Sequence, residues 1–183
     1  PSFQLGVMKE NDASLGLSGS GAFNGSNNQL TSFAGLSNSM NLMGGKFFGS
    51  FYWGKSNGIS NELGMIQSLS NLYSSAFGLG FLKSSIFYKA DTLMLTIDQP
   101  IRLESGRLQL NVPIYRTKEK NVLFNSMNFD LDPSGREIHV KAEYLTSYKN
   151  IGFGLTLGYK SDPYHIKFMD DYWYSSLGFN IKI

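Results

Sequence analysis

Two small groups of residues contain the side chains best suited to acid–base or metal chemistry. The sequence has two histidines and no cysteine. His139 alternates with Glu137 and Lys141, which places three ionisable side chains on one face of an extended segment. A histidine beside a carboxylate can shuttle protons or assist self-cleavage of a chain. Paired charges also line a water-filled wall at little energetic cost, and we favour this second interpretation.

The second group surrounds His165, which has Asp162, Asp170 and Asp171 close to it in the sequence. Imidazole and carboxylate groups are metal ligands, but a polar, turn-rich loop has the same composition, and we favour the loop. The lack of cysteine excludes a thiol nucleophile, a disulfide framework and a cysteine-ligated metal site. Serine, histidine and aspartate show no spacing that indicates a catalytic triad. We therefore expect no enzyme activity, no cofactor site and no metal site in this chain.

The elements that must position these side chains are β-strands, because apolar and polar residues alternate with a period of two. The alternation is sharpest in the last third of the chain, in residues 136–146, 151–159 and 172–183. In the first of these segments the apolar positions are Ile138, Val140, Ala142 and Tyr144. Each segment therefore has one apolar face and one polar face.

The rest of the chain shows the same pattern with less regularity. Further strands are predicted at residues 2–9, 14–24, 31–40, 44–54, 75–82, 92–98, 107–115 and 122–131. Residues 60–72 are ambiguous between strand and loop. The Asn-Gly pair within residues 55–58 predicts a tight hairpin. Turn-forming residues are found at 104–106, 117–121, 132–135 and 148–150. The sequence thus predicts about twelve strands in an up-and-down meander.

The bulk composition fits a single domain over residues 1–183. The formal net charge of +2 gives no field that would favour nucleic acid as a partner. Charged residues make up 16% of the chain, against about 25% in soluble domains, yet the mean hydropathy is only −0.17. Apolar residues that are spread by alternation explain both values. No apolar run of about 18 residues predicts a transmembrane helix. No signal peptide opens the chain, which we expect to be a mature form or a piece of a longer one.

An antiparallel transmembrane β-barrel explains this pattern better than a soluble β-sandwich. Strands from residue 91 onward are apolar on one face throughout, whereas the edge strands of a sandwich break that rule. Aromatic residues gather at strand ends, as in the interfacial girdles of outer-membrane barrels. The opposite face carries glycine, small polar residues and charges of both signs, which suit a wet lumen. The side chains expected to face the lumen are Asp98, Arg107, Gln109, Asn111, Glu137, His139, Lys141 and Glu143.

Two segments resemble the translocator domains of subtilisin-like serine protease autotransporters. The first segment contains Gln99, Pro100, Arg102, Glu104, Ser105 and Gly106 and continues through residues 108–113. The second contains Pro133, Ser134, Gly135, Arg136 and Glu137. Their order and spacing agree with the family, and the resemblance covers about residues 75–183. These motifs are structural, and the chain contains no motif of the passenger protease.

The resemblance implies a twelve-stranded barrel that anchors in the outer membrane of a Gram-negative bacterium and carries an N-terminal passenger to the cell surface by type V secretion. The implied partners are outer-membrane lipid, the barrel-assembly machinery and a passenger or linker segment. The family's C-terminal assembly signal maps onto Trp173, Leu177, Phe179, Ile181 and Ile183. The family usually ends in phenylalanine, so Ile183 departs from its pattern.

Two other functions stay open at this point. A small stand-alone outer-membrane barrel, acting as a pore or a structural protein, would show the same alternation. A soluble ligand-binding β-sandwich would use Trp53, Trp173 and nearby tyrosines to stack on a sugar.

The order of the strands also predicts which loops share a side of the membrane. If both chain ends lie in the periplasm, residues 132–135 and 161–171 face outward. Residues 117–121 and 148–150 then face the periplasm.

Overall fold

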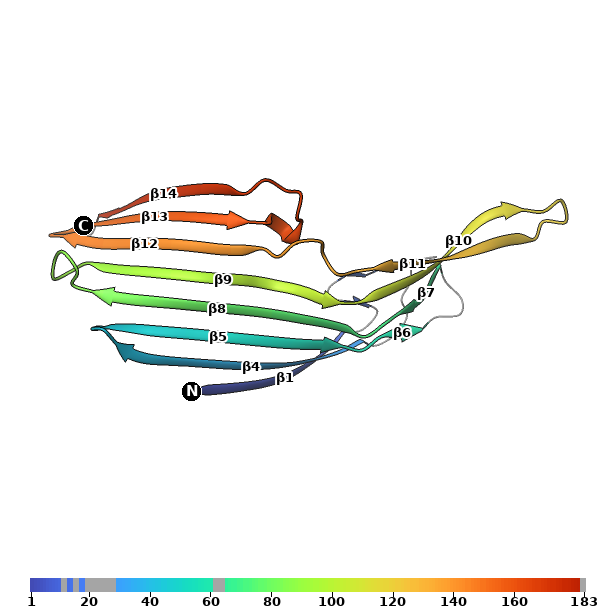
Figure 1. Ribbon diagram of the computed structural model, residues 1–183, viewed down its shortest axis with the longest axis horizontal. Coiled ribbons are helices and arrows are strands. Elements are labelled where there is room, and N and C mark those ends of the chain that lie inside the picture. The colour runs from blue at the N-terminus through green and yellow to red at the C-terminus, as the bar shows by residue number, and fades with distance from the viewer. Residues whose placement is uncertain (11–12, 15–16, 19–28, 61–64, 182–183) are drawn as a thin grey trace.

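The computed structural model describes residues 1–10, 13–14, 17–18, 29–60 and 65–181 (Figure 1). The strand pairings in these residues are all antiparallel, which confirms the all-β, antiparallel part of the predicted fold class. The one helical element in this part of the chain is a short 3-10 helix, η2 (Pro163–His165). Most of the predicted strand 14–24, part of the ambiguous segment 60–72 and Ile183 lie outside the described residues.

The strands are β1 (Ser2–Glu10), β2 (Ala13–Ser14), β3 (Leu17–Ser18), β4 (Gln29–Leu42), β5 (Gly45–Ser56), β6 (Ile59–Ser60), β7 (Ile66–Leu69), β8 (Leu72–Ser84), β9 (Thr92–Ser105), β10 (Arg107–Arg116), β11 (Val122–Asp130), β12 (Ile138–Tyr148), β13 (Ile151–Ser161) and β14 (Tyr172–Ile181). Apart from 14–24, the predicted strands coincide with observed ones wherever the chain is described. The prediction of one strand over 14–24 is wrong in its described part, because Ser14 of β2 pairs antiparallel with Leu17 of β3. The strongest difference in length is β9, which continues through Gln99 and Pro100 to Ser105.

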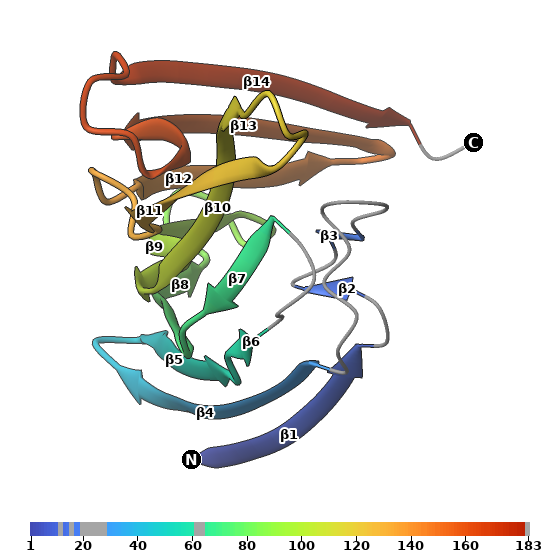
Figure 2. The same ribbon diagram turned by 90° about the vertical axis from the view of Figure 1, so that its right-hand side faces the viewer.

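The main element of the fold is an eight-stranded sheet in the order β1-β4-β5-β8-β9-β12-β13-β14. Its strands follow one another as an up-and-down meander, interrupted by excursions of the chain at one end. The sheet curls into a trough whose two lips are β1 and β14 (Figure 2). Within the described residues these two strands do not pair with each other, so the expected closed sheet of about twelve strands is not formed there.

A second sheet holds two of the predicted strands, 107–115 and 122–131, together with the short strands β6 and β7. Its order is β11-β10-β7-β6. The β10–β11 hairpin projects from one end of the eight-stranded sheet (Figure 1). Gly106 separates β9 from β10, and these two strands do not pair. The turn predicted at 104–106 is therefore the point at which the chain passes from one sheet to the other.

The tight hairpin predicted at residues 55–58 is wrong. β5 pairs with β4 and β8, while β6 pairs with β7. The backbone N–H of Asn57 donates to the carbonyl of Leu30 (3.0 Å), and the N–H of Gly58 donates to the side chain of Asn71 (2.9 Å). The Asn-Gly pair therefore ends β5 instead of reversing it, because distant segments provide its hydrogen-bond partners.

Two prolines lie inside strands at positions where the ladder is interrupted. In the β8–β9 pair, Ala76 faces both Pro100 and Ile101, because Ser75 pairs with Arg102 and Phe77 with Gln99. In the β10–β11 pair the register shifts between Pro113 and Tyr115. A bulge leaves one residue outside the hydrogen-bond ladder, so the missing N–H of proline is tolerated there.

The two ends of the eight-stranded sheet carry connections of different length. At one end β4–β5 and β12–β13 are joined by two-residue turns, and β8–β9 by residues 85–91. Met43 and Gly44 both have positive φ (54° and 69°), which is the conformation of a type I′ hairpin turn. The other end carries β2 and β3, the four-stranded sheet and residues 162–171. Residues 117–121 form the tip of the projecting hairpin, so the prediction that they share a side with 148–150 is wrong.

The register sorts side chains onto two faces. One row of paired residues crosses the sheet as Ser2, Ser37, Ser50, Gly78, Asp98, His139, Lys160 and Tyr172. The adjacent row is Asn38, Gly49, Leu79, Ile97, Val140, Tyr159 and Trp173. We call the face of the first row the inner face and that of the second the outer face. The side chains of His139 and Lys160 are only 21% and 23% exposed. Both lie on the inner face, where side chains on the concave side of a curled sheet converge.

The outer face is apolar and uncovered. Leu5, Val140 and Phe179 are 73%, 46% and 68% exposed. Of the leucine, isoleucine, valine, phenylalanine and methionine side chains in the described residues, only Leu69 and Leu72 are buried. The apolar residues therefore do not pack against one another into a core.

Candidate functional site

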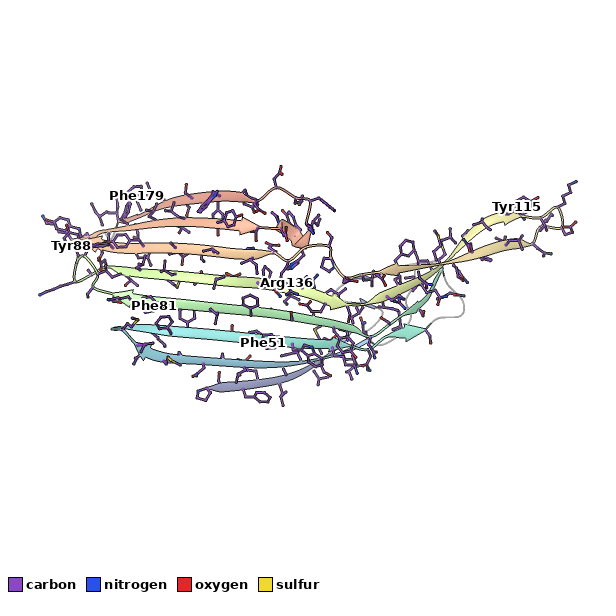
Figure 3. All side chains as sticks on the ribbon, in the orientation of Figure 1. Phe51, Phe81, Tyr88, Tyr115, Arg136 and Phe179 are labelled. Atoms are coloured by element: carbon purple, nitrogen blue, oxygen red, sulfur yellow. The ribbon has the colours of Figure 1, made fainter. Side chains whose placement is uncertain are left out.

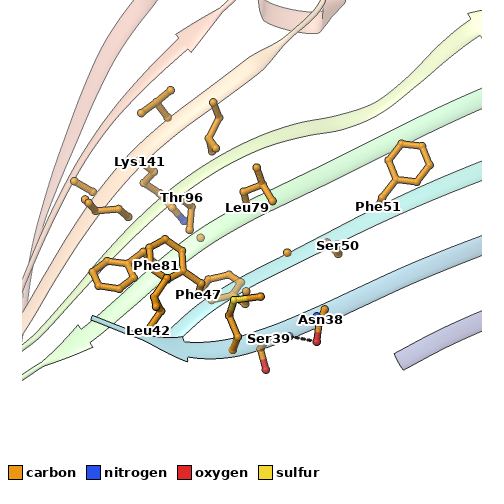
Figure 4. A pocket seen from close by; sticks show the side chains of 18 of the residues that line it. Asn38, Ser39, Leu42, Phe47, Ser50, Phe51, Leu79, Phe81, Thr96 and Lys141 are labelled. Carbon is orange, nitrogen blue, oxygen red and sulfur yellow. Dashed lines mark hydrogen bonds between the residues drawn. The ribbon is translucent and has the colours of Figure 1, made fainter. Parts of the chain in front are cut away.

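The outer face is one continuous apolar surface across the eight-stranded sheet. Phe51, Phe81 and Phe179 lie on it, on β5, β8 and β14 (Figure 3). A hollow of about 1000 Å³ spans this face from β4 to β14 (Figure 4). Its lining is mainly aromatic and aliphatic, and Phe47 and Phe81 stack there with ring centroids 4.5 Å apart. The exposed surface of the outer face therefore consists mainly of apolar side chains.

The inner face contains aromatic rings that lie over glycines of the neighbouring strand. The Phe48 ring lies over Gly80, and the Tyr174 ring lies over Gly158. Phe33 and Tyr52 cover Gly6 and Gly35 in the same way. A Cβ atom at any of these glycines would overlap the ring. Glycine at these positions therefore lets the rings lie flat against the sheet.

The first polar cluster joins the two segments on which the resemblance rests. Arg136 donates from Nη1 to Oε1 of Glu104 (3.1 Å) and from Nη2 to Oε2 (2.8 Å). Its Nη1 also donates to the side-chain oxygen of Gln99. Gln99 is 2% exposed and donates in turn to the carbonyl of Ser75 (3.2 Å). We call Gln99, Arg102, Glu104 and Arg136 the motif cluster.

Arg102 is the most enclosed charge of the motif cluster, with a side chain 12% exposed. Its Nη1 lies 2.6 Å from Oε2 of Glu104. Its Nε and Nη2 donate to the carbonyls of Gly135 (2.9 Å) and Pro133 (2.8 Å). The guanidinium thus ties the bulged part of β9 to the turn that leads into β12. A planar fork with several donors is well suited to hold two backbone carbonyls and a carboxylate together.

The second polar cluster lies beside the first, at the start of β12. Nε2 of His139 hydrogen-bonds Oε1 of Glu137, and Nδ1 of His139 lies 3.2 Å from Oδ2 of Asp98. Nζ of Lys160 lies 3.1 Å from Oε1 of Glu137. We call Asp98, Glu137, His139 and Lys160 the histidine cluster. Its members come from β9, β12, β13 and the turn before β12.

The loop between β13 and β14 docks on the histidine cluster through backbone contacts. Oε2 of Glu137 accepts the N–H of Tyr164 (2.7 Å). The backbone N–H of Glu137 donates to Nδ1 of His165 (2.9 Å), and Nε2 of His165 lies 3.1 Å from the carbonyl of Ile101. These partners assign the neutral tautomer with the proton on Nε2, since Nδ1 accepts and the carbonyl requires a donor.

Two loop carboxylates have pKa values below their ordinary range. Burial alone raises the pKa of Glu137, but hydrogen bonds from His139, Lys160 and the N–H of Tyr164 outweigh it. Hydrogen bonds from the Tyr159 hydroxyl and the N–H of Asp162 lower the pKa of Asp171. Both groups are therefore held as carboxylates at neutral pH.

The histidine cluster is arranged for ion pairing. A general base needs a ring nitrogen that can take a proton from a substrate, and both nitrogens of His139 face carboxylates. In the described residues no group of three or more histidine, cysteine, aspartate or glutamate side chains is arranged to hold a metal ion. The arrangement therefore fixes the strand ends and the loop 162–171 electrostatically.

The other predicted site residues fall in three places. Lys141 and Glu143 lie on the inner face and pair with each other (3.2 Å). Arg107, Gln109 and Asn111 lie on β10 in the four-stranded sheet, away from the histidine cluster. Trp173, Leu177, Phe179 and Ile181 lie on β14, whose residues are all exposed. That the first two groups face a lumen and the third is an assembly signal stay predictions.

The sequence pattern does not identify Lys160, Ser75 or Asp91 as members of a polar cluster. Lys160 is in phase with the polar residues of β13, but only the register shows that it meets Glu137. Asp91 accepts the backbone N–H groups of Ile86 (2.7 Å), Phe87 (2.8 Å) and Tyr88 (2.9 Å). An aspartate in a short connection between two strong strands is a signal that could have suggested this role.

No helix in the part of the chain that the structure describes has the length and apolar character needed to cross a bilayer. Comparisons with family models, with curated proteins and with solved structures give no match.

Proposed function

We propose that this chain is the membrane-embedded β-barrel wall of a Gram-negative outer-membrane protein. The observation that carries the proposal is the uncovered apolar outer face together with the near absence of buried apolar side chains in the described residues. A domain that is stable in water depends on burying apolar surface. Here that surface faces outward, so hydrocarbon chains of lipid are the environment that matches it.

The lengths of the strands and of their connections also support a membrane wall. β12, β13 and β14 have 11, 11 and 10 residues, and a tilted strand needs about 9–11 residues to cross a bilayer. Short turns at one end and long connections at the other are typical of outer-membrane barrels. The short-turn end would then face the periplasm and the long-connection end the exterior.

The translocator role is a finer proposal that rests on the resemblance. The two motif segments, which are far apart in the sequence, meet through Arg102, Glu104 and Arg136. This contact supports a shared structural role for the motifs. A reporter protein fused before Ser2 should become accessible to protease on intact cells if the barrel carries a passenger. A reporter that stays in the periplasm would favour the alternative, a stand-alone structural barrel.

The membrane proposal is tested by charge substitutions on the two faces of neighbouring strands. Val140→Arg on the outer face should lower the free energy of unfolding in lipid vesicles by about 2–4 kcal/mol, the cost of a basic side chain near the bilayer midplane. Thr156→Arg on the inner face should cost clearly less. Val140 is 46% exposed in the isolated fold, so a water-soluble protein would tolerate arginine there. Equal effects at both sites would contradict the proposal.

A further inference from the structure

The eight-stranded sheet has two edges, β1 and β14, that have no second neighbour among the described residues. Both edges are apolar on the outer face. Phe3 and Leu5 on β1 are 67% and 73% exposed, and Leu177 and Phe179 on β14 are 57% and 68% exposed. The unpaired backbone N–H and C=O groups of a sheet edge readily pair with another strand. Leaving these groups without hydrogen bonds in hydrocarbon costs several kcal/mol each.

The directions of the two edge strands allow them to pair with each other. Every neighbouring pair in the sheet is antiparallel, and the sheet has eight strands. The first and eighth strands therefore run in opposite directions, as antiparallel pairing requires. The two strands form the lips of the same trough (Figure 2), so closing the trough brings them together without rearranging any existing pair.

The register in the sheet sets the stagger with which such closure can occur. The row that starts at Ser2 of β1 ends at Tyr172, the first residue of β14. In a closed barrel, a row of paired residues that starts on the first strand returns to that strand at a different residue. The number of residues between the two positions is the shear of the barrel. The displacement must be even, because an odd one would turn the apolar side chains of one strand inward.

A displacement of eight residues brings Tyr172 opposite Glu10 and Ile181 opposite Pro1. The whole of β1 then lies opposite β14, and Ile181 is the one residue of β14 that faces outside β1. Phe3 faces Phe179 and Leu5 faces Leu177, with all four side chains on the outer face. Eight strands with a shear of eight have a tilt of about 36°, which is within the range of outer-membrane barrels. Larger or smaller displacements leave part of one edge without a partner.

We propose that β1 and β14 pair with this register, closing the sheet into an eight-stranded barrel in which Phe3 lies opposite Phe179. The proposal rests on the proposed membrane location and adds the strand number, the closing pair and the register. The interior of an eight-stranded barrel is just wide enough to be filled by side chains. Phe48 and Tyr174 lie on the inner face, so the closed barrel is an anchor with a filled interior and no wide channel. This closure favours the stand-alone structural barrel over the twelve-stranded translocator that the resemblance implies.

Disulfide formation tests the register, since the chain has no cysteine of its own. Directly opposed residues have Cβ atoms about 4.5–5.5 Å apart, close to what a disulfide needs. The double variants Phe3→Cys/Phe179→Cys and Leu5→Cys/Leu177→Cys, folded in lipid vesicles and oxidised, should each form an intramolecular disulfide. The readout is a shift of the monomer band on a non-reducing gel that disappears when the disulfide is reduced. Phe153→Cys/Phe179→Cys, a pair within the sheet, reports that the chain has folded and oxidation has worked.

Three results would overturn the proposal. Faster cross-linking of Leu5→Cys/Phe179→Cys would show a different register. Disulfide-linked dimers would show that the edges pair between two copies of the chain. A reaction of the Phe153→Cys/Phe179→Cys control alone would show that the sheet stays open or that other strands take its edges.

The outcome is separable from that of the membrane proposal. Cross-links at both predicted pairs, combined with equal tolerance of Val140→Arg and Thr156→Arg, would keep the closed barrel and remove its membrane location. An unreactive edge combined with a strong effect of Val140→Arg would keep the membrane location and remove the closure.

Discussion

Arg136 and Glu104 form a two-point ion pair between the turn before β12 and the end of β9, with N–O distances of 3.1 and 2.8 Å. Arg102 binds the same carboxylate from the other side (2.6 Å). One carboxylate therefore holds two guanidinium groups, each of which also reaches another part of the chain. This arrangement connects the bulged part of β9 to the turn that begins β12.

The two arginines of the motif cluster should differ in their contribution to stability. Arg102→Met should lower the free energy of unfolding by about 3 kcal/mol, because it leaves a partly buried carboxylate and two backbone carbonyls without a donor. Arg136→Met should cost about 1 kcal/mol, because its side chain is 46% exposed and solvent screens the pair. Denaturant titration in detergent micelles measures both values.

Arg107→Met is the matched control for these two variants. Arg107 pairs with Asp130 at 3.2 Å, but the two side chains are 67% and 71% exposed. Its removal should change stability by less than about 0.5 kcal/mol. An effect of Arg107→Met as large as that of Arg102→Met would contradict a special role for the motif cluster.

The contact between Phe48 and Gly80 predicts a compensating pair of substitutions. Gly80→Ala places a methyl group against the Phe48 ring and should destabilise the protein by about 1–3 kcal/mol. The same substitution in a Phe48→Ala background should cost much less, because the ring is gone. Gly78→Ala is the control, since its Cβ would lie 3.6 Å from Ser50 Oγ, an ordinary contact. Additive effects of the two substitutions would show that the ring does not lie over Gly80.

Acid should weaken the docking of the loop 162–171 through Glu137. The pKa of Glu137 is lower in the folded protein than its ordinary value of about 4.3. The unfolded chain therefore binds a proton at a pH at which the folded protein does not. The stabilisation is complete above the ordinary value and is lost as the pH falls through the lower, folded value.

Stability measured between about pH 5 and pH 3 should therefore fall more steeply in the native protein than in Glu137→Gln. The matched control is Asp130→Asn, which removes a carboxylate that is 71% exposed. Equal slopes for the native protein and Glu137→Gln would show that the histidine cluster does not stabilise the fold at neutral pH.

The position of the connections predicts which lysines a protease can reach on intact cells. Lys118, Lys120 and Lys167 lie at the end of the sheet with long connections, and Lys149 lies at the opposite end. If the long-connection end faces the exterior, trypsin should cut near the first three and spare Lys149. Mass spectrometry of the fragments identifies the sites. Cleavage at Lys149 together with protection of Lys167 would reverse the orientation.

The sequence alone determined the class of the fold and the two faces of its strands. Alternation is a local property, since successive side chains of a strand point to opposite faces whatever the strand pairs with. Ile138, Val140, Ala142 and Tyr144 could therefore be assigned to one apolar face without knowledge of their neighbours. The turn at residues 148–150 was predicted from local residue types in the same way.

Only the tertiary structure decided which strands are neighbours. The Asn-Gly pair at residues 57–58 has the local chemistry of a hairpin, yet Leu30 and Asn71 bind its backbone and β5 pairs elsewhere. β10 and β11 have the alternation of wall strands, but they pair in a separate sheet. The pairing of a strand depends on contacts between segments far apart in the chain, which no local pattern contains.

The polar clusters show the same division. Local phase placed Glu137 and His139 on one face, and the structure brings them together. That Lys160 meets Glu137, and that Arg136 meets Glu104, depends on the register of three strands and on the bulge at Pro100. A shift of one residue in any of these pairings would separate the charges, and this is why only the folded chain could define the clusters.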